Sequence, residues 1–368
     1  MFMKFDTLFE PLQIKKKAGL RNRVVMAPMT TISGEEDGRF SKQEIAYLVR
    51  RAKTGIGLIM TPACYCHKSG HAFERQVGCH SDAMLGRLSE CAESINETGT
   101  ASFLQIHHGG NAAKEAYTGS APWAPSAIIN RRGISEMPVA MTDGQIRTVI
   151  EAFARAAERA KQAGFTGIEL HGANTYLFQQ FFSPFTNKRE DRWGTQTMAN
   201  RSRFAVETVA AVRSAVGPEY PICYRISPEE EDPDGYSTME AIALLKLVVA
   251  AGVDMVHVSS WSYGTYLRGD LPHGKHPTLA IREALPREIP VIGVGSVRLP
   301  GDAIRVLGDG VDLVALGREL LLDADWLAKV REGRTSEIKT DLHSEQERQA
   351  LEIPERMKAY TKRFFALK

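Results

Sequence analysis

The sequence predicts an α/β protein of the (β/α)8 TIM-barrel class, a single domain with a long loop after the third strand. Short apolar runs recur eight times along the 368 residues, and helical patterns lie between them. The runs are mostly continuous rather than alternating, which is typical of strands buried on both faces of a parallel sheet. A doubly wound open sheet is the alternative, but it rarely reaches eight such units in this order, so a closed barrel is favoured.

Each expected strand follows a turn or charged residue, and the connecting segments have helical periodicity. The segment 142–163 opens with Thr142 and has Gln145 three residues later, a capping-box pattern. Ile146, Val149 and Phe153 then recur on one face. Residues 201–216 and 238–251 show the same kind of pattern. The expected strands are 24–27, 58–60, 102–106, 168–170, 222–226, 255–258, 291–294 and 313–316.

We expect the barrel to span residues 1–335 and a charged, amphipathic helical extension, residues 336–368, to pack on its outside. The insertion 109–141 follows the third strand, so it should roof a site at the carboxyl ends of the strands. The basic cluster of residues 15–17, together with Arg21 and Arg23, is expected to form a solvated turn between the N-terminal segment and the first strand.

Composition excludes several classes of protein. The net charge is +2, so no nucleic-acid-binding field is expected. No run of 18 apolar residues exists, so no membrane span is expected. Five cysteines, an odd number without a signal peptide before them, fit a reducing cytoplasm. Cys64 and Cys66 with His67 and His71 suggest zinc, but no second pair completes a site, so we expect no metal.

The strongest signal of chemistry is the stretch that begins at His171. An imidazole, an amide and a phenol, from His171, Asn174 and Tyr176, come directly after a buried strand. An imidazole and an amide can hold a carbonyl oxygen with two hydrogen bonds, and a phenol can deliver a proton at neutral pH. These groups suit the reduction of a carbon–carbon double bond conjugated to a carbonyl.

The ordered run from His171 through Tyr176 and a phenylalanine-rich stretch to Asn187 and Arg189 resembles the Old Yellow Enzyme family of flavin-dependent ene-reductases. The resemblance covers nearly the whole chain, including 104–109, 124–128 and 312–318. It implies non-covalently bound FMN, NADH or NADPH as reductant, and an electron-poor alkene or a quinone as substrate. His171 and Asn174 would bind the substrate carbonyl, and Tyr176 would protonate the α-carbon.

The ends of several strands offer groups that suit the flavin ring. The Gln105 amide matches the O2/N3 edge of the ring, and a cation at Arg225 near N1 would stabilise the reduced ring. Thr30 offers a hydroxyl, and the small side chain of Ala63 lets a flat ring approach. The residues expected at the ring are Ala27, Pro28, Met29, Thr30, Ala63, Gln105 and Arg225.

The phosphate is expected after the seventh and eighth strands, where barrels commonly bind phosphate on backbone N–H groups. Gly295 and Ser296 follow the seventh strand, and Gly317 and Arg318 follow the eighth. Arg318 would add a bidentate charge-assisted pair. The spacing around Gly295 lacks the third glycine of a dinucleotide fingerprint, so we reject that interpretation.

Three departures from the family pattern stand out. Thr30 replaces a cysteine that tunes the flavin in some members, Thr175 replaces a glycine, and residues 193–195 read Trp-Gly-Thr instead of Tyr-Gly-Gly. An NADH-dependent flavin or quinone reductase with little ene-reductase activity is one alternative. A flavin-free, phosphate-binding barrel lyase or isomerase is a remoter one. The sequence leaves open the choice between NADH and NADPH, the physiological substrate, and assembly into a homo-oligomer.

Overall fold

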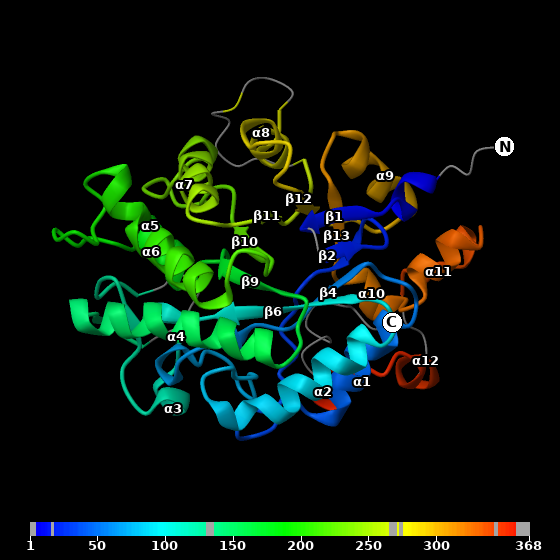
Figure 1. Ribbon diagram of the computed structural model, residues 1–368, viewed down its shortest axis with the longest axis horizontal. Coiled ribbons are helices and arrows are strands. Elements are labelled where there is room, and N and C mark those ends of the chain that lie inside the picture. The colour runs from blue at the N-terminus through cyan, green and yellow to red at the C-terminus, as the bar shows by residue number, and fades with distance from the viewer. Residues whose placement is uncertain are drawn as a thin grey trace.

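Eight parallel strands close into a barrel, so the predicted fold class is confirmed (Figure 1). The computed structural model describes residues 5–15, 18–129, 136–264, 271, 275–341 and 345–357. Neighbouring strands pair in the order β4-β3-β13-β12-β11-β10-β9-β6, and pairing of β4 with β6 closes the ring. The barrel strands are β3 (Val24–Met26), β4 (Leu58–Met60), β6 (Ala101–His107), β9 (Gly167–Gly172), β10 (Ile222–Ile226), β11 (Met255–Ser259), β12 (Val291–Val294) and β13 (Leu313–Leu316).

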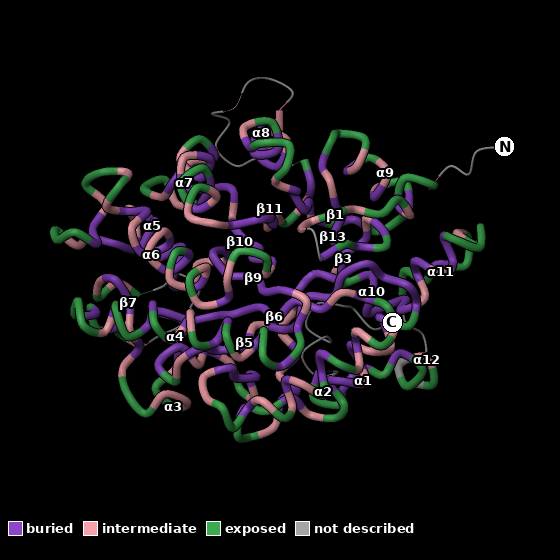
Figure 2. Tube along the Cα trace, in the orientation of Figure 1, coloured by how far each residue is buried: buried purple, intermediate pink, exposed green. Residues whose placement is uncertain are grey.

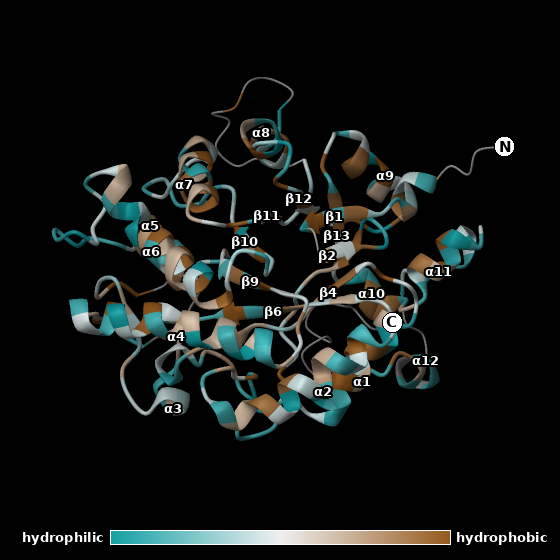
Figure 3. Cartoon of the chain, viewed as in Figure 1, coloured by the Kyte–Doolittle hydropathy of each residue, from teal (hydrophilic) through white to brown (hydrophobic). Residues whose placement is uncertain are grey.

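Amphipathic helices cover the outside of the barrel. The predicted capping box of α4 is present, with the Thr142 side chain accepting from the Gln145 N–H and the Gln145 side chain accepting from the Thr142 N–H. Buried and exposed positions alternate along the helices, which carry both apolar and polar residues (Figures 2 and 3). The longer helices are α1 (Lys42–Ala52), α2 (Leu85–Asn96), α4 (Asp143–Gln162), α6 (Met198–Val216), α7 (Thr238–Ala250), α8 (Pro277–Ala284) and α9 (Pro300–Gly308).

Shorter elements lie in the loops that connect the barrel strands and helices. Two of them, β7 and β8, pair in parallel and join the middle of the insertion 109–141 to its carboxyl-terminal end. The short strands are β5 (Cys64–Tyr65), β7 (Trp123–Ala124) and β8 (Val139–Ala140), and the short helices include α3 (Glu115–Thr118), α10 (Glu319–Leu322) and α11 (Trp326–Arg331).

An antiparallel hairpin, which the sequence did not predict, lies at the amino-terminal end of the barrel. Its strands are β1 (Leu12–Lys15) and β2 (Ala18–Leu20), and Leu12 and Leu20 pack against the apolar cluster inside the barrel. The expectation of a solvated turn at residues 15–17 is wrong for Lys15. Its ammonium pairs with Asp254 at 2.7 Å, because the hairpin brings the end of β1 against the barrel. Lys16 and Lys17 lie outside the described residues.

The carboxyl-terminal segment contacts the barrel through α1. Arg51 donates to the backbone oxygen of Leu351 at 2.7 Å, and the side chains of Leu351, Ile353 and Met357 are buried. The short helix α12 (Glu345–Ala350) precedes this contact. Residues 342–344 and 358–368 lie outside the described part of the chain, and the domain division at residue 335 stays a prediction.

Inward-facing side chains form layers inside the barrel, because every second residue of a strand points to the same side. The layers nearest the amino-terminal ends of the strands are apolar, and one cluster there, which packs against the hairpin, includes Val25, Leu58, Phe103, Met255 and Leu313. Nearer the carboxyl ends, the inward-facing residues differ in polarity from strand to strand. On β3, β12 and β13 they remain apolar, whereas on β6, β9, β10 and β11 they become polar. The candidate site therefore has an apolar floor and one polar wall.

Candidate active site

The polar wall consists of four buried side chains from four consecutive barrel strands. Gln105 lies on β6, Glu169 on β9, Arg225 on β10 and His257 on β11. All four are buried, and Glu169 and His257 have no exposed surface. Parallel pairing places them side by side, with Gln105 opposite Glu169 and Arg225 opposite His257. Closure of the sheet thus brings Gln105 and Arg225, which were predicted as cofactor residues, together with Glu169 and His257, which were not predicted from the sequence.

Glu169 is the centre of this wall. Its Oε1 accepts from Gln105 Nε2 at 2.7 Å, and its Oε2 lies 2.7 Å from His257 Nδ1 and 3.5 Å from Cys223 Sγ. Burial opposes the charge of Glu169, but His257, Arg225 and these hydrogen bonds outweigh it and hold the pKa of the carboxyl below its ordinary value. Burial also lowers the pKa of His257, and the neighbouring Glu169 carboxylate opposes that shift. The sequence signal for both was a polar residue in the middle of an apolar strand.

The three predicted catalytic residues lie together at the carboxyl end of β9. His171 is within the strand rather than after it, Asn174 follows in the turn, and Tyr176 is the N-cap residue of α5 (Leu177–Phe182). The ring centroids of His171 and Tyr176 are 4.9 Å apart. Asn174 and Thr175 both have left-handed backbone angles, with φ of 59° and 64°. This turn reverses the chain within two residues, which brings Tyr176 back beside His171.

A hydrogen-bond relay orients the amide of Asn174. Arg225 Nη2 donates to Ser259 Oγ at 3.1 Å, and Ser259 Oγ donates to Asn174 Oδ1 at 3.2 Å. The Asn174 backbone N–H also donates to Ser227 Oγ at 2.9 Å. Because the oxygen of the amide is used as an acceptor, its NH2 group is the end that can donate to a ligand.

His171 is also set up as a donor. Its Nδ1 accepts from the Ala173 N–H at 3.4 Å, which places the proton of the neutral ring on Nε2. Burial, with smaller contributions from His107 and Arg225, holds the pKa of His171 well below its ordinary value, so the ring is neutral at physiological pH. His107, from the motif at residues 104–109, packs edge-on against Tyr176, with ring centroids 4.3 Å apart.

The residues expected at the phosphate also come together. Arg318 Nη2 donates to Ser296 Oγ at 3.3 Å, which joins the loops after β12 and β13. A side chain at Gly295, whose φ is 141°, would meet the Tyr263 backbone nitrogen at 2.5 Å, so only glycine allows the two backbone segments to approach. Arg318 and Ser296 are accessible to solvent, as a binding site for a hydrophilic group requires.

The remaining expected residues lie where β3 and β4 end. Pro28 is buried, whereas Met29 and Thr30 are half-buried after β3, and Ala63 is half-buried after β4. A Cβ added at Gly317 would lie 3.5 Å from Met29 Sδ and 4.0 Å from Ala27 Cβ. The ends of β3 and β13 therefore meet at this point. Thr61 Oγ1 accepts from the Gln105 backbone N–H at 3.0 Å, which ties β4 to the polar wall.

The cysteines and nearby histidines do not form a metal centre in the described structure. Within it, no group of three or more His, Cys, Asp or Glu residues is arranged to hold a metal. Cys64 and Cys66 are buried, and burial raises the pKa of both thiols well above the ordinary value. No described helix is long and apolar enough to cross a membrane.

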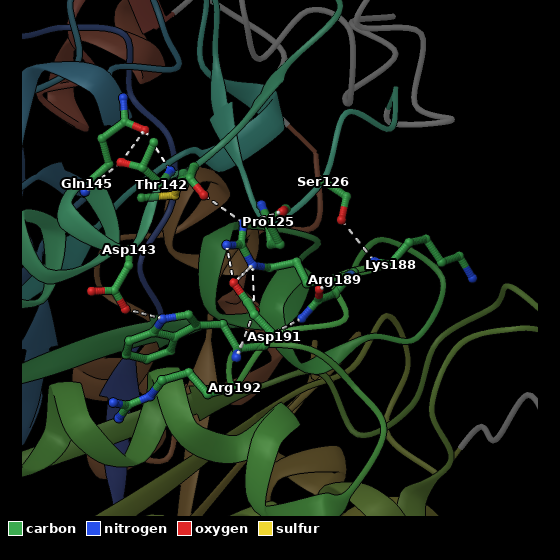
Figure 4. Close-up of polar contacts among 12 residues, drawn as sticks. Pro125, Ser126, Thr142, Asp143, Gln145, Lys188, Arg189, Asp191 and Arg192 are labelled. Atoms are coloured by element: carbon green, nitrogen blue, oxygen red, sulfur yellow. Dashed lines mark hydrogen bonds and ion pairs between the residues drawn. The ribbon is translucent and has the colours of Figure 1, made fainter.

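The insertion 109–141 is anchored by the segment that follows α5 (Figure 4). Arg189 Nη1 donates to the backbone oxygens of Pro125 at 3.0 Å and Met141 at 2.6 Å, and Asp191 pairs with the same guanidinium. The indole N–H of the buried Trp193 donates to Asp143 Oδ1, with Nε1 2.7 Å from the oxygen.

A groove of about 490 Å³ lies between the insertion and the segment that follows α5. It is lined by residues 125–128, Ala140 and residues 188–191. The candidate catalytic and cofactor residues are not part of its lining.

A parallel barrel with a donor pair, a phenol and a buried cation at the carboxyl ends of its strands suits an oxidoreductase, and the comparisons with known proteins give the class: the protein is a flavin-dependent NAD(P)H oxidoreductase of the Old Yellow Enzyme type. The sequence matches the NADH:flavin oxidoreductase / NADH oxidase family over residues 7–337. The chain belongs to this family.

Three similar proteins illustrate the range of the family. The chain is 34% identical over 346 residues to the probable NADH-dependent flavin oxidoreductase YqiG of Bacillus subtilis (strain 168), covering 92% of this chain and 91% of that protein. It is 36% identical over 361 residues to NADH:fumarate oxidoreductase of Klebsiella pneumoniae (strain 342), with 95% of this chain but only 38% of that protein covered. A solved structure of morphinone reductase in complex with tetrahydroNAD is 28% identical, with a TM-score of 0.75 and coverage of 89% of this chain and 91% of that one.

Proposed function

We propose that this protein binds FMN non-covalently at the carboxyl end of the barrel and uses NADH or NADPH to reduce the C=C bond of α,β-unsaturated carbonyl compounds. The observation that carries the proposal is the group His171, Asn174 and Tyr176. Hydrogen bonds elsewhere leave the first two with donors available, and the phenol lies against the His171 ring. A site that only passed electrons to a soluble acceptor would not need this arrangement.

The residues present fit FMN. Arg225 Nε is buried without a hydrogen-bond partner among the described residues, and a buried cationic donor with a free N–H suits an anionic ligand group. Gln105 has its Nε2 engaged by Glu169, so the oxygen of its amide can accept from the ring N3–H. Ser296 and Arg318 would hold the phosphate, with Gly317 leaving space beside them. When bound, the flavin supplies hydride acceptance and donation.

The protein's own residues would bind and polarise the alkene. The Nε2–H of His171 and the NH2 of Asn174 would donate to the carbonyl oxygen of the substrate and stabilise the negative charge that develops there. The phenol of Tyr176 would deliver a proton to the α-carbon. The anchored insertion 109–141 would limit the access of water.

The first test is the absorption spectrum of the purified protein before and after acid precipitation. A flavin band that moves to the supernatant supports non-covalent binding. A colourless protein that does not take up added FMN would exclude the proposal and favour the flavin-free lyase or isomerase.

The second test separates the two half-reactions of a Tyr176→Phe variant by stopped-flow absorbance. We expect flavin reduction by NADH to be unchanged and alkene reduction to slow by about 10²-fold or more, because the proton donor is lost. Tyr220→Phe is the matched control, since the Tyr220 hydroxyl donates to the Phe165 backbone at 2.9 Å, away from the candidate site. Equal loss in both half-reactions would contradict the role of Tyr176.

The family description also names NADH oxidase, which favours a second candidate function. A flavin or quinone reductase of this kind would turn over rapidly with quinone or oxygen and reduce no enone. A panel of enones, quinones and oxygen assayed with both nicotinamide cofactors distinguishes the two functions.

A further inference from the structure

We propose that Glu169 is a positioning residue of the flavin site, which holds the Gln105 amide in one orientation and lowers the reduction potential by placing a buried negative charge near Arg225. The inference rests on the proposed function, because it needs a bound flavin. Glu169 lies in the middle of β9, two residues before His171 and fully buried, so its effect would be transmitted through its neighbours.

The hydrogen bonds of Glu169 determine which end of Gln105 faces the ligand. Glu169 Oε1 accepts from Gln105 Nε2 at 2.7 Å, and its Oε2 contacts His257 Nδ1 at 2.7 Å. An ionised carboxylate has no proton to donate, so both contacts are donated by the partner. The Gln105 oxygen is therefore directed away from Glu169 and can accept a hydrogen bond from a ring N–H. Without the carboxylate, the amide would have no reason to prefer this orientation.

The charges of the polar wall lead to the second part of the proposal. Glu169 and Arg225 are both buried on neighbouring strands, where Glu169 pairs with Cys223, two residues before Arg225. At this position the charge of Glu169 counteracts the lowering of the Arg225 pKa by burial. A cation beside the ring favours the reduced flavin, and a nearby anion opposes it. Glu169 therefore limits how far Arg225 raises the potential.

Structural support alone would be a simpler role for Glu169, so the experiment must separate that role from an electrostatic one. Glu169→Gln removes the charge and retains the size of the side chain. Cys223→Ala is the matched control, because Cys223 is fully buried, contacts the same carboxylate at 3.5 Å and carries no charge. Both variants are compared with the parent protein as flavin-loaded enzymes.

The first readout is the midpoint potential of the bound flavin, measured by equilibration with a reference dye. We expect Glu169→Gln to raise the reduced-to-oxidised ratio at a fixed ambient potential at least tenfold, which for a two-electron couple is a shift of about 30 mV. Cys223→Ala should leave the potential unchanged. An unchanged potential in Glu169→Gln, or an equal shift in the control, would overturn the electrostatic role.

The second readout is the dissociation constant of FMN, measured by fluorescence quenching with the flavin-free protein. We expect Glu169→Gln and Gln105→Ala each to weaken binding about tenfold or more, and the double variant to bind no more weakly than either single variant, because one acts through the other. Losses that multiply in the double variant would show that Glu169 does not act through Gln105.

Glu169→Asp provides a second route if Glu169→Gln does not fold. It retains the charge but is too short to reach both Gln105 and His257, so FMN binding should weaken while the potential stays near that of the parent. Parent-like FMN affinity in Glu169→Asp would overturn the positioning role. A parent protein that binds no flavin would instead refute the proposed function, so the two failures are distinguishable.

Discussion

Thr175 shows at the scale of one residue how the site departs from the family pattern. It is a β-branched residue with φ of 64°, a region in which such side chains are strained, and it stands where the family has glycine. Its backbone is held on both sides, because its N–H donates to Gln179 at 2.9 Å and its oxygen accepts from Gln180 at 2.7 Å. The surrounding contacts therefore impose the turn that glycine would adopt without strain.

Thr175→Gly should consequently be tolerated and should stabilise the protein by up to about 1 kcal/mol, because relief of strain slightly exceeds the added chain entropy of glycine. Thermal denaturation of the flavin-loaded protein measures this. Glu352, exposed with φ of 52°, offers a comparison away from the site. A loss of more than about 1 kcal/mol at Thr175 would mean that its side chain contributes more than its backbone strain costs.

Glu44 provides a pH-dependent prediction. It is fully buried on α1, where it accepts a hydrogen bond from Thr31, and burial raises its pKa to about 7. An unfolded glutamate has a pKa of about 4.3. The folded state thus holds the proton more tightly, and stability is lost as the pH rises from the unfolded value through about 7.

Glu44→Gln keeps a neutral side chain at both pH values. Its stability relative to the parent should therefore be higher at pH 8 than at pH 4 by roughly 3 kcal/mol. Urea unfolding of both proteins at the two pH values measures the difference. A difference that does not change with pH would show that Glu44 does not titrate in this range.

At the scale of elements, the anchoring of the insertion depends on one guanidinium. Arg189 holds the backbone of the insertion at Pro125 and at Met141, which are distant in sequence. We expect Arg189→Ala to increase cleavage of residues 109–141 by thermolysin several-fold, because the loop opens locally more often.

Arg192→Ala is the control for this experiment, because Arg192 pairs with Glu207 on α6 and not with the insertion. If the two variants were cleaved at the same rate and at the same sites, Arg189 would not be the anchor. If the insertion roofs the site as predicted, Arg189→Ala should also raise KM for the alkene more than KM for NADH.

The elements themselves were largely predictable. Strands β4, β10, β12 and β13 begin and end where the apolar runs do, because burial on both faces requires continuous apolar sequence. The predicted strand 168–170 is shorter than the observed β9 (Gly167–Gly172). The polar side chain of His171 indicated the start of a loop, although His171 lies at the buried end of the strand. The hairpin of β1 and β2 was missed because its short strands acquire their apolar partners only when the barrel closes.

At the scale of the molecule, the two ends of the barrel have different roles: the amino-terminal end carries stabilising ion pairs, and the carboxyl end carries the candidate site. Asp254 lies at the amino-terminal end, where it pairs with Lys15 at 2.7 Å and Arg213 at 2.5 Å and accepts from the Ile222 N–H at 2.9 Å. These contacts join the hairpin, α6 and β10. The candidate site lies at the opposite end, so stability and catalysis are spatially separated.

Asp254→Asn should therefore destabilise the fold by about 2–3 kcal/mol, since it breaks largely buried ion pairs, while the affinity for FMN stays unchanged. Urea unfolding and flavin titration measure the two quantities. Glu151→Gln, which breaks an exposed pair with Arg155, should cost less than about 1 kcal/mol. A coupled loss of flavin affinity in Asp254→Asn would show that the two ends are not independent.

The sequence by itself determined the barrel, the order of its strands and the group of His171, Asn174 and Tyr176, because these depend on local periodicity and on residues that are close along the chain. Only the tertiary structure revealed the polar wall. Gln105, Glu169, Arg225 and His257 come from four different strands, and parallel pairing around a closed ring brings them into contact. The proposed role of Glu169 depends on these neighbours, and the sequence alone does not give the distances between residues on different strands.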